Sequence, residues 1–151
     1  MLWVWGMFGA PDSVTANGSL TDWGVDEQNA LTLSYQGGGQ AQLMSSLVAQ
    51  CPGIATVVGS LGYLESIGSM NNPSGLRVRA GWNGAGGDTD RVEEFTLAWR
   101  GYSHELREVT RCIQAELQQS PTMPWQDSLD IMRFFDGVRA QIGVVYPHDL
   151  Q

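Results

Sequence analysis

Apolar and polar residues alternate through much of the first two thirds of the chain. In the segment 29–35, NALTLSY, Leu31, Leu33 and the following tyrosine are apolar, and small or polar residues stand between them. This period of two is that of a β-strand with one buried face. The glycine run at 36–39 tolerates a left-handed backbone, and an extended pattern resumes at 40–50. We therefore expect a hairpin here.

Further strand-like segments follow at short intervals. The dipeptide Asn17–Gly18 predicts a turn within SVTANGSL. Glycine or Asn-Pro separates the later segments IATVVGS, YLESI, LRVRAGW and VEEFTLAW, and the glycine-rich stretch 83–88 predicts a loop. Because short connections favour antiparallel neighbours, the pattern predicts a mostly antiparallel sheet of about six to eight strands.

The period changes to that of a helix in the last third. Between His104 and Gln118, apolar residues recur at spacings of three and four, which places them on one helical face: Leu106, Val109, Ile113 and Leu117. A second helix is expected from Pro124, since proline is favoured at the first helical position, to Gly143, which ends it. Its expected inward residues are Leu129, Met132, Phe135, Val138 and Ile142.

Strands followed by helices indicate an α+β fold in which the helices cover one face of an open sheet. The second face is expected to carry small, polar or mildly apolar side chains: Thr32, Ser34, Gln42, Met44, Ser46 and Val48. Charge depletion is typical of interface cores, so this pattern favours cover by another chain over a merely solvated face.

The composition fits one domain and argues against several kinds of partner. With 151 residues, 42% of them hydrophobic, the chain can form one sizeable core. Its net charge of −8 repels nucleic-acid phosphates and anionic membrane surfaces. The apolar start, MLWVWGMFG, lacks the basic residues of a leader and is too short to span a bilayer. We expect a cytoplasmic protein with neither a nucleic-acid nor a membrane partner.

The residue types present restrict the chemistry. All eight basic residues are arginines, so no lysine can serve as a catalytic acid. Cys51 and Cys112 stand far apart, which makes a disulfide framework or a zinc site improbable, and Cys112 is expected to be a small buried side chain rather than a nucleophile. The glycine clusters at 37–39 and 84–87 do not follow the order strand, glycine loop, helix that binds phosphates. No metal, cofactor or catalytic residue is predicted.

One cluster, RGYSHEL at 100–106, is a candidate substrate-binding site. It lies at the expected junction of a strand and a helix, where free backbone amides and positive potential can bind a hydroxylated or anionic ligand. Tyr102 and His104 are the candidate substrate-binding residues. Alternatively, Ser103 caps the helix, Tyr102 packs on the sheet and His104 is an exposed residue of the first turn.

Four stretches together carry a family resemblance: GAPDSVTANG, GVDEQNALTLSYQGGGQAQL, GYSHELREVTRCIQ and SPTMPWQDSLDIMRFFDGVRAQIGVVYP. In order and spacing, from about Phe8 to Pro147, they resemble the C-terminal domain of the glucose-fructose oxidoreductase, inositol dehydrogenase and rhizopine catabolism family. The dihydrodiol dehydrogenase-like branch is the most similar. The chain departs from that branch at Ala115–Glu116, where a glycine is common, and we expect this to affect the helix end and not the site.

The resemblance implies an oxidoreductase that transfers hydride between NAD or NADP and a sugar, polyol or related alcohol. Family members have an N-terminal Rossmann domain that binds the cofactor. Their C-terminal domain, with a fold like that of dihydrodipicolinate reductase, contributes substrate contacts and an oligomer interface through its open sheet. An aromatic hydroxyl lies near the substrate at the family position of Tyr102.

Residues 1–151 then form a single C-terminal domain without its Rossmann domain. The glycine fingerprint G-x-G-x-x-G and the family's E-K-P-type segment are both missing from the chain. We therefore expect that it binds no cofactor, is inactive alone, forms a homo-oligomer through the open sheet face and has the missing Rossmann domain as a partner. The opening residues are expected to be the last turns of a family helix. The alternative is a stand-alone, non-catalytic binding or interaction module that has lost the Rossmann domain.

Overall fold

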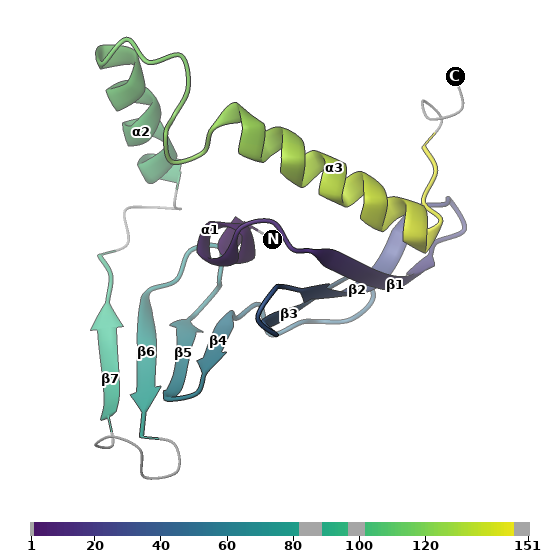
Figure 1. Cartoon of the computed structure of the whole chain (residues 1–151), viewed down its shortest axis with the longest axis horizontal. Coiled ribbons are helices and arrows are strands. Elements are labelled where there is room, and N and C mark those ends of the chain that lie inside the picture. The colour runs from purple at the N-terminus through teal and green to yellow at the C-terminus, as the bar shows by residue number, and fades with distance from the viewer. Residues whose placement is uncertain (1, 82–88, 97–101, 147–151) are drawn as a thin grey trace. The chain divides into compact units, whose positions relative to one another are not determined.

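The computed structural model describes residues 2–81, 89–96 and 102–146 (Figure 1). Two compact units are present, residues 1–51 with 121–151 and residues 52–120, and each is described by itself. The elements of the first unit are α1 (Leu2–Phe8), β1 (Ser13–Leu20), β2 (Asp26–Ser34), β3 (Gln40–Ser46) and α3 (Trp125–Ile142). Those of the second are β4 (Thr56–Gly59), β5 (Gly62–Ile67), β6 (Gly75–Ala80), β7 (Thr89–Glu94) and α2 (Tyr102–Gln114).

The first unit contains a three-stranded antiparallel sheet in the order β1-β2-β3. Strands β2 and β3 form the predicted hairpin, and Gly37 and Gly38 in its turn have the positive φ values, 83° and 86°, that glycine adopts without strain. The register pairs Leu31 with Leu43 and Thr32 with Gln42. The predicted assignment of apolar and polar residues to opposite faces is therefore confirmed.

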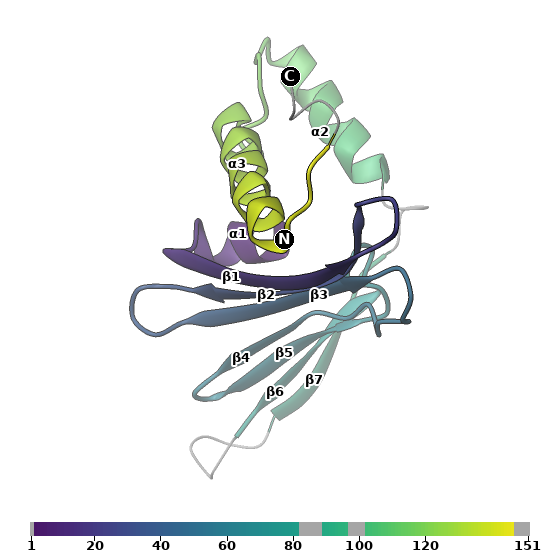
Figure 2. The same ribbon diagram turned by 90° about the vertical axis from the view of Figure 1, so that its right-hand side faces the viewer.

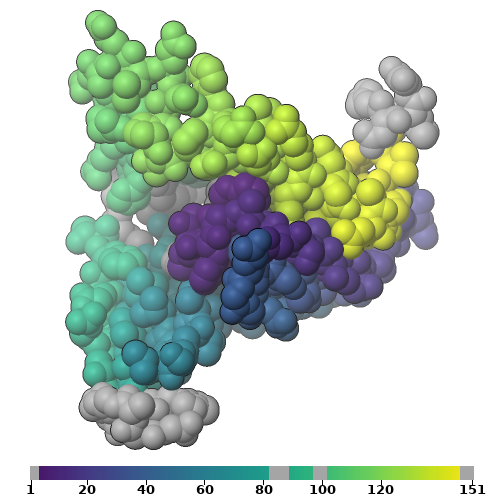
Figure 3. Space-filling view, viewed as in Figure 1, coloured from purple at the N-terminus to yellow at the C-terminus, as the bar shows by residue number. Residues whose placement is uncertain are grey.

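Helix α3 covers the apolar face of this sheet (Figure 2). Leu33 is completely buried, and the core cluster around it consists of Ala16, Leu31 and Val138. Val4 of α1 also packs against this cluster, and Figure 3 shows α1, in purple, beside the yellow-green α3. Residues from the first 43 positions and from the C-terminal helix α3 thus share one core.

The inward face of α3 differs from the prediction in its first half. Ile131 and Val138 are the buried residues of the helix, whereas Leu129 and Met132 are more than half exposed. The sheet contact of α3 is made chiefly with the edge strand β1, and the helix residues packed on the core lie in its second half. The predicted end is confirmed, because Gly143 caps α3 with a φ of 87°.

The predicted turn at Asn17–Gly18 is wrong, because both residues lie inside β1, where Gly18 pairs with Asn29. A Cβ atom on Gly18 would lie 2.7 Å from the carbonyl oxygen of Gln28 and 3.0 Å from Cγ2 of Ile142 on α3. The glycine therefore permits close approach of the helix to the strand. The actual turn follows β1, where the Thr21 amide donates to the Val25 carbonyl.

The second unit contains a four-stranded antiparallel sheet in the sequential order β4-β5-β6-β7. Arg77 and Arg79 on β6 both form ion pairs with Asp90 on β7. The α+β class and the antiparallel strands are confirmed, but the seven described strands form two sheets and not the one open sheet expected. The loop predicted at 83–88 lies outside the described residues.

The opening residues form the predicted helix, α1, and its end is fixed on the first unit. The ring of Phe8 lies 5.7 Å from that of Tyr35, measured between centroids. Trp5 is half-buried. None of the described helices is long and apolar enough to cross a membrane.

Candidate functional site

Helix α2 carries both residues predicted to bind substrate. Tyr102 and His104 stand in its first turn, together with Glu105, whose negative charge suits the positive end of the helix dipole. Arg100 and the glycine after it, which belong to the same motif, lie outside the described residues.

The two candidate side chains leave α2 in different directions. Residues two apart are separated by about 200° around a helix. Tyr102 stands in line with an apolar stripe, which we call the α2 stripe: Tyr102, Leu106, Val109 and Ile113. These side chains are 68%, 67%, 55% and 70% exposed. His104 shares the other side of the helix with Glu108, so the helix itself does not bring Tyr102 and His104 together around one ligand.

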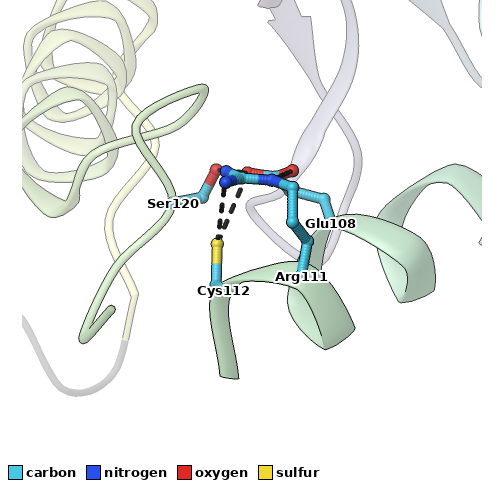
Figure 4. A network of polar contacts seen from close by, with 4 residues as sticks. All are labelled: Glu108, Arg111, Cys112 and Ser120. Carbon is cyan, nitrogen blue, oxygen red and sulfur yellow. Dashed lines mark hydrogen bonds and ion pairs between the residues drawn. The ribbon is translucent and has the colours of Figure 1, made fainter. Parts of the chain in front are cut away.

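A polar network on the side of α2 away from the stripe holds the following loop (Figure 4). The carboxylate of Glu108 accepts two hydrogen bonds of 2.8 Å from the guanidinium of Arg111. Its Oε1 also accepts from Ser120 Oγ at 2.5 Å and from the thiol of Cys112 at 3.4 Å. One carboxylate thus joins the last turns of α2 to residue 120.

The network sets the charge states of its members. Hydrogen bonds from Arg111 and then Ser120 lower the pKa of Glu108 from 4.5 to about 2. Burial, followed by the adjacent Glu108 carboxylate, raises the pKa of the Cys112 thiol. Since Cys112 is only 6% exposed, it is a small buried side chain, as predicted.

The end of α2 shows the effect expected from the missing glycine. Glu116 has a φ of 55°, in the left-handed region that a side chain seldom adopts. The Leu117 amide donates to the Cys112 carbonyl and the Glu116 amide to the Ile113 carbonyl, which is the bond pattern of a Schellman helix end. The strained residue lies beyond the last turn and far along α2 from Tyr102.

The hollow and the unpaired buried hydroxyl found in the described chain do not involve the predicted site residues. A hollow of about 240 Å³ in the first unit is lined by Val25, Asp26, Glu27, Ser45, Ser46 and Leu47, and neither predicted site residue lines it. The buried hydroxyl of Tyr35 has no hydrogen-bond partner in the described part of the chain. Among the described residues, no group of three or more His, Cys, Asp or Glu side chains gathers in a way that could hold a metal ion.

Comparisons with known proteins identify the relatives. No family model matches the chain. It is 34% identical over 142 residues to the trans-1,2-dihydrobenzene-1,2-diol dehydrogenase of Xenopus tropicalis, covering 91% of this chain and 42% of that enzyme. The Danio rerio enzyme of the same name is 30% identical over 141 residues, covering 93% and 42%. The chain is therefore similar to the C-terminal domain of these oxidoreductases.

A solved structure shares the fold of the chain. A solved oxidoreductase from Agrobacterium radiobacter, in complex with NAD+, L-tartaric acid and magnesium, matches 93% of this chain and 43% of its own length with a TM-score of 0.65. Their sequence identity is 13%, so this likeness concerns the fold alone. The chain spans about 42% of the length of the curated relatives.

The contact from Ser120 to Glu108 was not predicted. The spacing of Glu108 and Arg111 is that of a helical ion pair and was visible in the sequence. The position of Ser120 depends on the left-handed turn at Glu116, which the sequence offered no glycine to signal.

Acid should weaken the link between α2 and its following loop. The folded pKa of Glu108 is below its ordinary value, so its contribution to stability is complete above pH 4.5 and is lost as the pH falls from 4.5 toward about 2. Thermal unfolding followed by circular dichroism from neutral pH to pH 3 should show an acid-dependent loss that Glu108→Gln reduces. Glu105→Gln, on the same helix, is the control. An identical acid loss in wild type and Glu108→Gln would contradict the assigned role.

Proposed function

We propose that the chain is the substrate-side and assembly domain of an NAD(P)-dependent oxidoreductase that acts on a diol, polyol or sugar. In this proposal it has no activity alone and works together with a cofactor-binding domain. The observation that carries the proposal is the match to the dihydrodiol dehydrogenases, which covers nearly all of this chain and less than half of theirs. The alternative, a stand-alone binding module, is an outcome of the test below.

The residues present do not fit a dinucleotide site. A Rossmann site needs parallel strands joined by a helix, with a glycine loop aimed at the helix N-terminus. The paired strands of the described chain are all antiparallel, and the sequence contains no G-x-G-x-x-G. We therefore propose that a domain other than this one binds the NAD or NADP.

The exposed α2 stripe supports a partner domain. Four adjacent side chains of a helix, among them Leu106 and Ile113, are each more than half exposed. Contiguous apolar surface of this kind is typical of interaction sites. Tyr102 stands at the N-terminal end of the stripe, where its hydroxyl can reach a substrate held between two domains. We propose Tyr102 and His104 as substrate contacts.

A chimera tests the proposed function. This chain replaces the matching C-terminal part of the Xenopus tropicalis dehydrogenase, and reduction of NADP+ or NAD+ is followed with trans-1,2-dihydrobenzene-1,2-diol as substrate. We expect turnover by the chimera, because the absent cofactor site is restored. We expect neither turnover nor calorimetric binding of NAD(P) by the chain alone.

Two variants of the chimera test the site. Tyr102→Phe should lower kcat/KM about tenfold, because a lost hydrogen bond to a buried substrate costs ~1.5 kcal/mol, and Tyr63→Phe on β5 should leave kcat/KM unchanged. A folded chimera that binds NADP+ but turns over neither diols nor sugars would contradict the proposed function and favour the stand-alone module. Equal kinetics for Tyr102→Phe and Tyr63→Phe would remove Tyr102 from the site.

We also propose that the chain forms a homo-oligomer through the outer face of the three-stranded sheet. In the register of the strands, this face is made of Ser13, Thr15, Asn17, Ser19, Gln28, Ala30, Thr32, Ser34, Gln40, Gln42, Met44 and Ser46. None of them is charged, and Met44 is 63% exposed. A sheet face made of uncharged residues suits burial against a second copy, because few charges have to be desolvated.

Sedimentation equilibrium at micromolar concentration checks the assembly. We expect a dimer or higher assembly for the wild type and dissociation for Met44→Lys, which buries an unpaired charge in the interface. Gln126→Lys, on α3 and away from this face, should leave the assembly intact. A wild-type monomer would refute the proposed interface.

A reducing, cytoplasmic location is proposed on the cysteine chemistry. Cys51 and Cys112 are both free thiols, and oxidising compartments favour paired cysteines.

A further inference from the structure

Strand β1 lies at an edge of the three-stranded sheet. Its own sequence has none of the residues that usually prevent an edge strand from pairing with another strand. Among the described strands, the order β1-β2-β3 leaves one side of β1 without a strand partner. Edge strands are commonly protected by charged side chains or proline. The sequence of β1, SVTANGSL, contains neither. An edge of this kind is a template for a further strand.

The side chain of Gln141 occupies this edge. The backbone amide of Ala16 donates to Oε1 of Gln141 at 2.9 Å. Nε2 of Gln141 donates to the carbonyl oxygen of Val14 at 3.2 Å. These two backbone groups flank Thr15 and point away from β2, since successive residues of a strand present their groups to alternate edges.

The amide of Gln141 therefore repeats the hydrogen bonds of a neighbouring strand. In a parallel pair, one residue accepts from the amide on one side of its partner and donates to the carbonyl on the other side. Here the Gln141 side-chain amide makes both bonds: its oxygen accepts from the Ala16 amide and its nitrogen donates to the Val14 carbonyl. Gln141 reaches the edge because α3 packs directly on β1, and Gly18 leaves room for its neighbour Ile142.

We propose that Gln141 closes the β1 edge as a strand mimic and prevents a second copy of this chain from adding to the sheet through β1. We name a second copy of this chain as the partner because one β1 strand can pair with another β1 strand. Antiparallel pairing of two β1 strands would place small or apolar residues together on one face and uncharged polar residues on the other. This edge is separate from the outer face proposed for the oligomer.

The first test removes the side-chain amide. In Gln141→Ala, hydrogen exchange of the Ala16 amide should be about tenfold faster, because one hydrogen bond is lost. The variant should also form concentration-dependent assemblies that bind thioflavin T. These should persist in the Met44→Lys background, in which association through the outer face is blocked. Gln126→Ala, on the same helix, should behave as the wild type in both measurements.

A second variant tests the role of Gln141 in case Gln141→Ala disturbs folding. Glu at position 141 retains the acceptor for the Ala16 amide, loses the donor to Val14 and adds a charge at the edge. Gln141→Glu should keep the slow exchange of Ala16 and should not associate, because a charge at a strand edge opposes pairing. Unchanged Ala16 exchange with no association in Gln141→Ala, or association of Gln141→Glu through β1, would overturn the proposal.

Discussion

The close contact between helix α3 and strand β1 is the constraint on which the first unit depends. Gly18 leaves the space that Ile142 needs, with a would-be Cβ only 3.0 Å from its Cγ2. This approach brings Val138 over Leu33 and Ala16 to form the core. It also carries Gln141 to the open edge of β1. The packing of the helix, the core and the contact of Gln141 with the sheet edge are thus all made where α3 lies close to β1.

The sequence predicted the elements better than their contacts. Alternation gave the strands and their faces correctly, because the period of two reflects burial on one side of β2. The Asn17–Gly18 dipeptide misled, because glycine serves a turn and a close approach equally well. The first half of α3 misled for a related reason: its apolar stripe predicts a sheet beneath Leu129, whereas the core contacts of α3 begin with its second half.

The candidate site shows a similar limit. The sequence predicted a strand-to-helix junction at Tyr102 and His104, but the opposite directions of the two side chains follow only from α2 beginning at Tyr102. The hydrogen bond from Ser120 to Glu108 depends on a left-handed Glu116, which no sequence pattern signals. The family resemblance supplied what local physics could not. Under the proposed function, the exposed α2 stripe and the uncharged sheet face are surfaces that a partner domain and a second copy would cover.

The most direct test of the contact between α3 and β1 is the free energy of unfolding of two glycine variants. Gly18→Ala should destabilise the protein by about 1–3 kcal/mol, because its Cβ would clash with the Gln28 carbonyl oxygen of β2 and with Ile142 of α3. Gly137→Ala, on α3 where nothing lies within 4 Å of the added atom, should be stabilising by about 0.5–1 kcal/mol. Equal or greater stability of Gly18→Ala in denaturant unfolding would contradict the central role of this contact.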